Sequence, residues 1–425
     1  MHCLVLLAIA LPVLAQDRFA PDEALLRARI LLHEPLQKVI GATYIQTIER
    51  SYYKRTLAHD ARETCDSIVG QKIKGQAKLQ LYAKDRLRLQ GGVSASGEET
   101  YRWPDSSLAL AAEVREQTAG PFHTGALGPI ISGVFQNQAA EVTFKSERNM
   151  DGRPMYEYRF RVTKTASNYR LKQGEAFAYD GAILLDPETA ALRRITVRST
   201  ELPVSTGACE ATVDVEFSRS PDLPQVLLPI SHRLHFILRN GDESENISVY
   251  RAHPPAQPVS LALFAVRSGL RYFAELRTPI DTATAAAGDV VELAAVADPE
   301  NERPRPSNKK RPLPLKLPVG TPLQARIVGI ERQFGKPNYF LIALAIETVF
   351  VNGESYYLPS IMVSSAPPQL WEAVRKAQGQ TEWKVQWQMG WQVHNRFNDF
   401  GKLVFQSSKP DYTVPIGHVV SFLTK

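Results

Sequence analysis

The stretch Lys78–Leu89 reads KLQLYAKDRLRL and decides the fold class of this chain. Apolar residues alternate with polar ones on both sides of the pair Lys84-Asp85, at Leu79, Leu81, Ala83, Leu87 and Leu89. A period of two is typical of a strand with one buried face, and the polar pair in the middle favours a turn. We therefore expect an antiparallel hairpin here, in a mainly β (α+β) protein.

The same alternation recurs farther along the chain, in the runs 141–146, 156–163, 175–179, 193–198, 211–217, 232–238 and 246–250. Short turn sequences follow two of these runs, at Met150-Asp151-Gly152-Arg153 and Arg239-Asn240-Gly241-Asp242. Such connections predict an antiparallel meander. Helical spacing is found in Pro21–Ile40, which Pro35 divides, and a two-part helical segment is expected in Ser106–Phe135.

A proline-rich stretch, His253–Ser260 (HPPAQPVS), precedes a second β region. Strand patterns there cover 270–276, 290–296, 323–331, 339–350, 356–363, 381–393, 402–407 and 418–423, with a helix at 368–378 and a turn at Asn352-Gly353. The predicted organisation is a signal peptide (1–15), a first domain (16–252), a linker (253–260) and a second domain (261–425). Because the linker is stiff and has few apolar side chains to dock, we expect each domain to fold alone.

The N-terminus has the features of a secretory signal peptide. Cys3–Ala10 is an uninterrupted apolar run, too short to span a bilayer, and Val13-Leu14-Ala15 offers a cleavage site after Ala15. We expect a periplasmic or outer-membrane-associated protein without a transmembrane span. Removal of Cys3 leaves Cys65 and Cys209 in an oxidising compartment, so we expect them to form a disulfide; two unpaired buried thiols are the alternative.

Composition and motifs exclude several function classes. The net charge of +6 over 425 residues is too small and too dispersed to favour nucleic acid as a partner. The chain has no HExxH, GxSxG, P-loop or GxGxxG motif, so the sequence nominates no catalytic residue, no cofactor and no metal site. His232 and His235 would point to opposite faces of a strand and could not share a metal ion.

Three further features have a plain explanation and a sharper alternative. An acidic cluster near Cys65 is better explained as solvated charge than as an acid/base site: His59, Asp60, Glu63 and Asp66. An aromatic stripe fits a barrel core, with a platform for sugar rings or a partner protein as the alternative: Trp383, Trp387 and Trp391. The basic stretch Asn301–Lys316 fits a solvated loop, with acidic envelope polymers or lipid headgroups as alternative partners.

Four blocks resemble an uncharacterised family of secreted proteins from Gram-negative soil bacteria: 27–50, 101–105 (YRWPD), 178–197 (AYDGAILLDPETAALRRITV) and 227–246. The strand-DPET-strand element and the strand order of the first domain resemble periplasmic lipoprotein carriers. This resemblance implies a half-barrel closed by helices around an apolar cavity. Segments 276–292 and 317–332 resemble the small β-barrel of the outer-membrane ring subunit in type IV secretion and conjugation systems.

This chain departs from the family in its cysteines. Members usually carry one in each of the strands that match Thr43–Arg50 and Asn246–His253, and this chain has none in either stretch. The resemblance therefore implies that a bridge between Cys65 and Cys209 is particular to this chain.

The implied half-barrel makes the apolar strand face a candidate cavity, lined by Leu79, Leu81, Leu87, Leu89, Tyr156, Tyr158, Phe160, Phe177 and Val197. The segment Ser106–Phe135 would cover it, and its glycines leave little bulk: Gly120, Gly125, Gly128 and Gly133. The resulting hypothesis is non-enzymatic binding of a lipid or lipidated partner. Alternatives are an assembly module of an envelope or secretion complex, and an enzyme acting on glycan or peptide without a recognisable motif.

Overall fold

The computed structural model describes residues 18–33, 43–56, 62–93, 99–106, 131–136, 140–167, 175–199, 202–219, 227–253, 261–299, 314–363 and 401–425. Several expectations concern residues outside this set: the signal peptide 1–15, His59 and Asp60, most of segment 106–135, linker residues 254–260, most of the basic stretch, the helix at 368–378, and the stripe Trp383, Trp387 and Trp391. The described chain is mostly β-strand with few helices, which confirms the predicted fold class.

The first half contains α1 (Pro21–His33), β1 (Thr43–Arg55), α3 (Cys65–Ile73), β2 (Leu79–Val93), β3 (Glu99–Arg102), η1 (Ser132–Gln136), β4 (Ala140–Met150), β5 (Arg153–Val162), β6 (Tyr179–Leu185), β7 (Leu192–Ser199), η2 (Val204–Thr206), β8 (Ala208–Arg219), β9 (Leu227–Leu238) and β10 (Glu243–His253). All its strand pairs are antiparallel, in the order β4-β5-β6-β7-β8-β9-β10-β1-β2-β3. No pairing among the described strands joins β4 to β2 or β3, so the sheet is an open half-barrel.

The hairpin predicted at Lys84-Asp85 is wrong. β2 is one strand that pairs with β1 from Leu79 to Gly92. The apolar alternation continues past Lys84-Asp85, as it does in a single strand. A register shift opposite Tyr52 and Tyr53 separates Leu79 and Leu81 from the residues beyond Ala83. Asp85 accepts hydrogen bonds from the guanidinium of Arg50 on β1 at 2.6 and 2.5 Å, which holds it within the sheet.

Other predicted boundaries in the first half also change. The pattern at 175–179 predicts a strand, but β6 begins at Tyr179 and runs to Leu185. The helix predicted from Pro21 is α1, which is described as far as His33. The turn after β4 has positive φ at Asp151 (52°) and Gly152 (83°), the backbone geometry of a tight hairpin, which confirms that connection.

The second half contains β11 (Ala262–Leu263), β12 (Arg271–Leu276), β13 (Ile280–Asp281), β14 (Val290–Val296), β15 (Pro322–Gln333), β16 (Asn338–Val351), β17 (Glu354–Met362), β18 (Leu403–Ser407), β19 (Thr413–Val414) and β20 (Val419–Thr424). The cycle β12-β14-β15-β16-β17-β20-β12 is antiparallel throughout and closes a small barrel. Its interior is filled by the chain's own apolar side chains, among them Ile342, Leu344 and Phe422, each 0% exposed. This barrel has a packed core.

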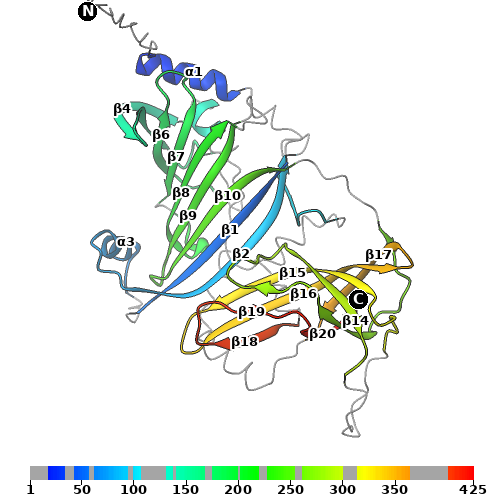
Figure 1. The fold of residues 1–425 in the computed structure, drawn as a ribbon. Helices are drawn as coiled ribbons and strands as arrows, with labels where there is room; N and C mark the ends of the chain where they lie inside the picture. Colours follow the sequence, from blue (N-terminus) through cyan, green and yellow to red (C-terminus); the bar gives the residue numbers. More distant parts are fainter. Residues whose placement is uncertain are drawn as a thin grey trace, which may run out of the picture.

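The two halves are joined by main-chain pairing as well as by the linker. β15 of the barrel runs antiparallel beside β2 of the half-barrel, with Glu331 opposite Asp85 and Gln333 opposite Ala83 (Figure 1). The N–H of Phe334 donates to the carbonyl of Tyr82 at 2.7 Å. Eighteen of the described strands therefore form one continuous sheet across the predicted boundary, and β13 and β19 form a separate pair.

Candidate functional site

A row of residues that are paired from strand to strand crosses the half-barrel, on the face that α1 covers. From β5 to β2 it consists of Tyr158, Ile183, Ile195, Val215, His232, Ser248, Ile48 and Leu87. All of them are at most 3% exposed. The row is apolar on β5 to β8, polar on β9 and β10, and apolar again on β1 and β2. This inner face therefore has two apolar zones with a polar zone between them.

The first apolar zone gathers five of the residues predicted to line a cavity: Tyr156, Tyr158, Phe160, Phe177 and Val197. Gly181 lies opposite Phe160 on β6, and a Cβ there would lie 2.7 Å from the Phe160 ring. The missing side chain thus leaves room for this aromatic ring beside β6. Gly133 of η1 has the same role, since a Cβ would lie 2.6 Å from the hydroxyl of Tyr179.

Helix α1 covers the first zone with small side chains. Ala24 and Ala28 are 0% exposed and Leu32 is 5% exposed, whereas Leu26 and Ile30 on the opposite side of the helix are 58% and 62% exposed. These inner positions are four residues apart, which places them on one face of the helix.

Three hydrogen bonds fasten the beginning of α1 to the sheet and its turns, one of them from the N–H of Phe19 to the carbonyl of Pro187 at 2.9 Å. The hydroxyl of Tyr156 donates to the carbonyl of Phe19 at 2.9 Å, and that of Tyr158 donates to the carbonyl of Pro21 at 2.6 Å. Burial raises the pKa of the Tyr158 hydroxyl, so it stays a donor at physiological pH. These bonds lie at the N-terminal end of the helix, and Ala24, Ala28 and Leu32 make its buried apolar contacts.

The other four predicted residues lie elsewhere. Leu87 and Leu89 belong to a second cluster with Ile48, Trp103 and Ala287, the last contributed by the second half. Leu79 and Leu81 are half-buried at the beginning of β2 and belong to neither cluster. The structure therefore does not bring all nine residues together around one space.

The polar zone was not predicted as a site. Its side chains are at most 1% exposed: Gln46, His232, Ser244, Asn246 and Ser248. The amide of Gln46 donates to the hydroxyls of Ser248 at 3.1 Å and Tyr250 at 3.0 Å, linking β1 to β10. These residue types are common on exposed strand faces, so the sequence gives no signal that they are buried here.

No group of three potential metal ligands lies together among the described residues. His232 lies on the inner face, and His235 lies on the outer face with its Nε2 2.7 Å from the carboxylate of Glu243, as the strand period requires. In the acidic cluster, Glu63 is held by Arg55 at 2.5 and 3.0 Å, and Asp66 is exposed in the first turn of α3. The described part of this cluster is an ion pair and a helix terminus, without a convergent acid/base arrangement.

The predicted disulfide is present. The Sγ atoms of Cys65 and Cys209 are 2.06 Å apart, and the bond fixes the first residue of α3 to β8. Ile68 of α3 packs beside it against Ile237. Lys72 at the end of the helix contacts the buried carboxylate of Glu243 at 2.5 Å.

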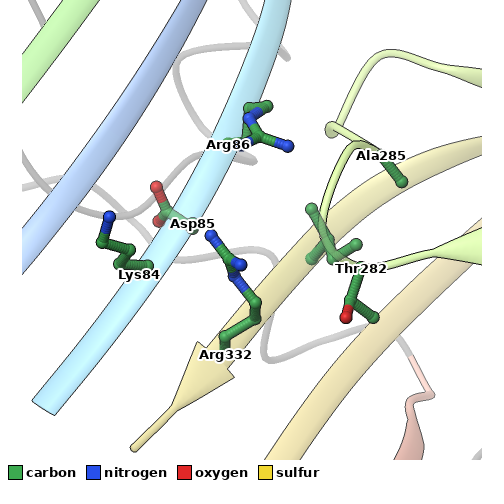
Figure 2. A pocket seen from close by; sticks show the side chains of 7 residues that line it. Lys84, Asp85, Arg86, Thr282, Ala285 and Arg332 are labelled. Carbon is green, nitrogen blue, oxygen red and sulfur yellow. The ribbon is translucent and has the colours of Figure 1, made fainter. Parts of the chain in front are cut away.

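A shallow, charged surface depression lies at the junction of the two halves. Its lining comes from β2, from the segment around Thr282 and Ala285, and from β15 (Figure 2). The charged groups around it are paired with one another: Lys84 and Arg86 with Glu49 at 2.7 Å each, Arg50 with Asp85, and Arg332 with Asp411 at 2.8 Å. This pairing makes the depression a structural joint and leaves the inner face as the candidate binding surface.

No family model and no curated protein matches this sequence. Among solved structures, an outer membrane lipoprotein-sorting protein domain from Vibrio parahaemolyticus has 11% identity and a TM-score of 0.24, over 56% of this chain and 94% of that one. A DUF1329 family protein from Desulfovibrio piger has 10% identity and a TM-score of 0.25, over 56% and 94% of the two chains. A LolA superfamily protein from Nitrosomonas europaea has 8% identity and a TM-score of 0.22, over 54% and 90%.

These descriptions fall in the class that the first domain resembles in sequence, and none of them concerns the resemblance stated for the second domain. TM-scores this low carry no argument about function. The architecture rests on the strand pairing described above.

Proposed function

We propose that this chain is a non-enzymatic protein of the cell envelope that binds a lipid or a lipidated partner between α1 and the inner face of the half-barrel. Its compartment in this proposal is the periplasm or the inner surface of the outer membrane. None of the described helices is long and apolar enough to cross a membrane.

One observation carries the proposal: a wide apolar sheet face is covered by α1, a helix that contacts it through apolar side chains. The buried contacts of α1 come from Ala24, Ala28 and Leu32, against aromatic rings such as Tyr158 and Phe160. An acyl chain that replaces these contacts exchanges one apolar surface for another. The free-energy cost of the replacement is therefore small.

The polar zone supports an amphipathic ligand. It lies in the same row as the apolar zone, and Ser248 and Gln46 there are fully buried. Hydroxyl and amide groups in an otherwise apolar interior favour a ligand with a polar end, because they can hydrogen-bond to it where hydrocarbon cannot.

A fluorescent fatty acid tests the proposal. We expect saturable binding to the full chain at micromolar concentration. Ala28→Trp places an indole in the space between α1 and the sheet, so affinity should fall at least about tenfold, or about 1.4 kcal/mol. Ile30→Trp is the matched control, because the same side chain is then added to the same helix on its exposed side, and it should bind as the wild type does.

Three results would contradict the proposal: no saturable binding by the wild type, equal or tighter binding by Ala28→Trp, or an equal loss in both variants. Thermal unfolding of each variant distinguishes a lost site from a lost fold. The expected combination is cooperative unfolding of both variants, with a lower melting temperature and reduced binding in Ala28→Trp because the indole overpacks a buried position.

A further inference from the structure

The junction between the two halves places two carboxyl groups opposite each other. Glu331 of β15 and Asp85 of β2 are partners in the antiparallel pairing of these strands. Directly opposite residues have Cβ atoms about 5 Å apart, and like charges at such positions repel. The pairing is unusual, because acidic side chains are more common at strand positions that face solvent.

The surrounding charges favour the ionised form of Asp85 more than that of Glu331. Arg50 is 2% exposed and forms a two-pronged ion pair with Asp85. Glu331 accepts a hydrogen bond of 2.8 Å from the amide of Gln333, a neutral donor. Asp85 therefore has its own buried cation, and Glu331 lacks an equivalent contact in the described ion pairs.

We propose that Glu331 and Asp85 form a proton-dependent joint that holds the half-barrel and the barrel together more tightly as the pH falls below neutrality. The joint is independent of the proposed lipid site, which lies on the other side of the polar zone. In this joint Glu331 takes up one proton from water, and its neutral carboxyl group no longer repels Asp85.

Other ionisable groups that face this pair among the described residues are Arg50, Tyr52, Tyr82, Arg332 and Lys402. Burial raises the pKa of Glu331 and Asp85 adds to this, whereas the hydrogen bond from Gln333 and the charges of Lys402 and Arg50 lower it; the net direction is upward. Burial also raises the pKa of Asp85 against the opposing effect of Arg50. The pKa of both tyrosines is raised well above its ordinary value, so these remain neutral.

The sign of the effect follows from linkage. A group with a raised pKa in the folded state binds its proton more tightly there than in the unfolded chain. The stabilisation is therefore complete below the ordinary glutamate pKa and is lost as the pH rises through the raised one. Between these two pKa values, the folding equilibrium changes about tenfold for each pH unit.

The test compares the full chain with Glu331→Gln by denaturant unfolding between about pH 5 and about pH 8. The amide is a neutral stand-in for the protonated acid, so the variant should be more stable than the wild type near pH 8 and equal to it near pH 5. Glu292→Gln is the matched control, because Glu292 is an exposed strand residue of the same barrel. Its difference from the wild type should not depend on pH.

The joint itself is read from hydrogen exchange at the N–H of Phe334, which donates across the junction to Tyr82. Its protection in the wild type, corrected for intrinsic exchange, should increase about tenfold for each pH unit as the pH falls from the raised to the ordinary glutamate pKa. Glu331→Gln should weaken this dependence and leave only the part that comes from the raised pKa of Asp85. An unchanged dependence in Glu331→Gln, or lower stability of that variant near pH 8, would overturn the proposal. If the variant does not fold, the infrared band of protonated carboxyl groups is followed in the wild type as the pH is changed. Titration of every carboxyl group in the ordinary pH range would refute the joint.

Discussion

Gly288 lies where the main chains of the two halves meet. Its φ is +107°, and a Cβ there would lie 2.1 Å from the carbonyl oxygen of Arg88 and 3.0 Å from the ring of Trp103. Its own carbonyl accepts a hydrogen bond from the guanidinium of Arg326 at 2.6 Å. The position therefore requires both the backbone freedom and the small size of glycine.

We expect Gly288→Ala to destabilise the chain by at least about 2 kcal/mol, because it adds a steric clash to an unfavourable backbone conformation. Gly320→Ala is the matched control, since Gly320 has a φ of +86° but no atom within 4 Å of its Cβ position. Denaturant unfolding of both variants separates the two contributions. Equal losses would show that the close approach to Arg88 has no energetic weight.

Single residues also explain why apolar alternation does not mark β1, where only the family resemblance implies a strand. Its inner positions include Gln46 and Arg50, which are buried although their types predict exposure. Ser248 and Asp85 on neighbouring strands satisfy them. Because those partners are far away in the sequence, no local pattern of apolar residues marks this strand.

At the scale of elements, alternation predicts strands well where one face meets an apolar core. β5 and β14 to β16 lie close to the predicted boundaries, and their inner positions are buried. The alternation of apolar and polar residues does not indicate which part of the chain packs on the apolar face of a strand. Leu87 and Leu89 were thus assigned to the same cavity as Tyr158, whereas their cover includes Ala287 of the other half.

Helix α3 was missed because its signal is weak. It has nine residues and one buried residue, Ile68, and it begins at a Thr64 cap whose hydroxyl accepts from the N–H of Ser67 at 3.3 Å. A helix this short is marginal by itself. The disulfide to β8 and the contact of Lys72 with Glu243 supply the missing stability.

Removal of this disulfide tests that account. We expect a chain with both Cys65→Ser and Cys209→Ser to lose about 2–5 kcal/mol of unfolding free energy, with the largest loss of hydrogen-exchange protection in α3. A reductant should destabilise the wild type and leave the double variant unchanged. Labelling of thiols in denatured, unreduced wild type should detect neither cysteine; two labelled cysteines, or equal stability with and without reductant, would refute the bridge.

At the scale of the whole molecule, the junction buries groups from both halves. Trp103 is 1% exposed in a cluster that includes Ala287. Arg326 of the barrel, with a side chain 2% exposed, is paired with Glu347 at 2.7 Å and donates to the carbonyl of Pro104 at 3.0 Å. These contacts come from residues far apart in the sequence, so the composition of the linker could not indicate them.

Expression of residues 16–252 and 261–425 as separate chains tests how far the halves depend on each other. The linker predicts that each folds alone, and the junction predicts that each is then less stable than in the full chain. The separated first half exposes Trp103, a loss of about 2–3 kcal/mol for a large apolar side chain, and the separated barrel deprives Arg326 of the Pro104 carbonyl. Calorimetry should show lower melting temperatures for both pieces and one cooperative transition for the full chain.

Two transitions in the full chain at the temperatures of the isolated pieces would mean that the pairing of β2 with β15 contributes no coupling. A piece that does not fold alone would move the domain boundary into the continuous sheet.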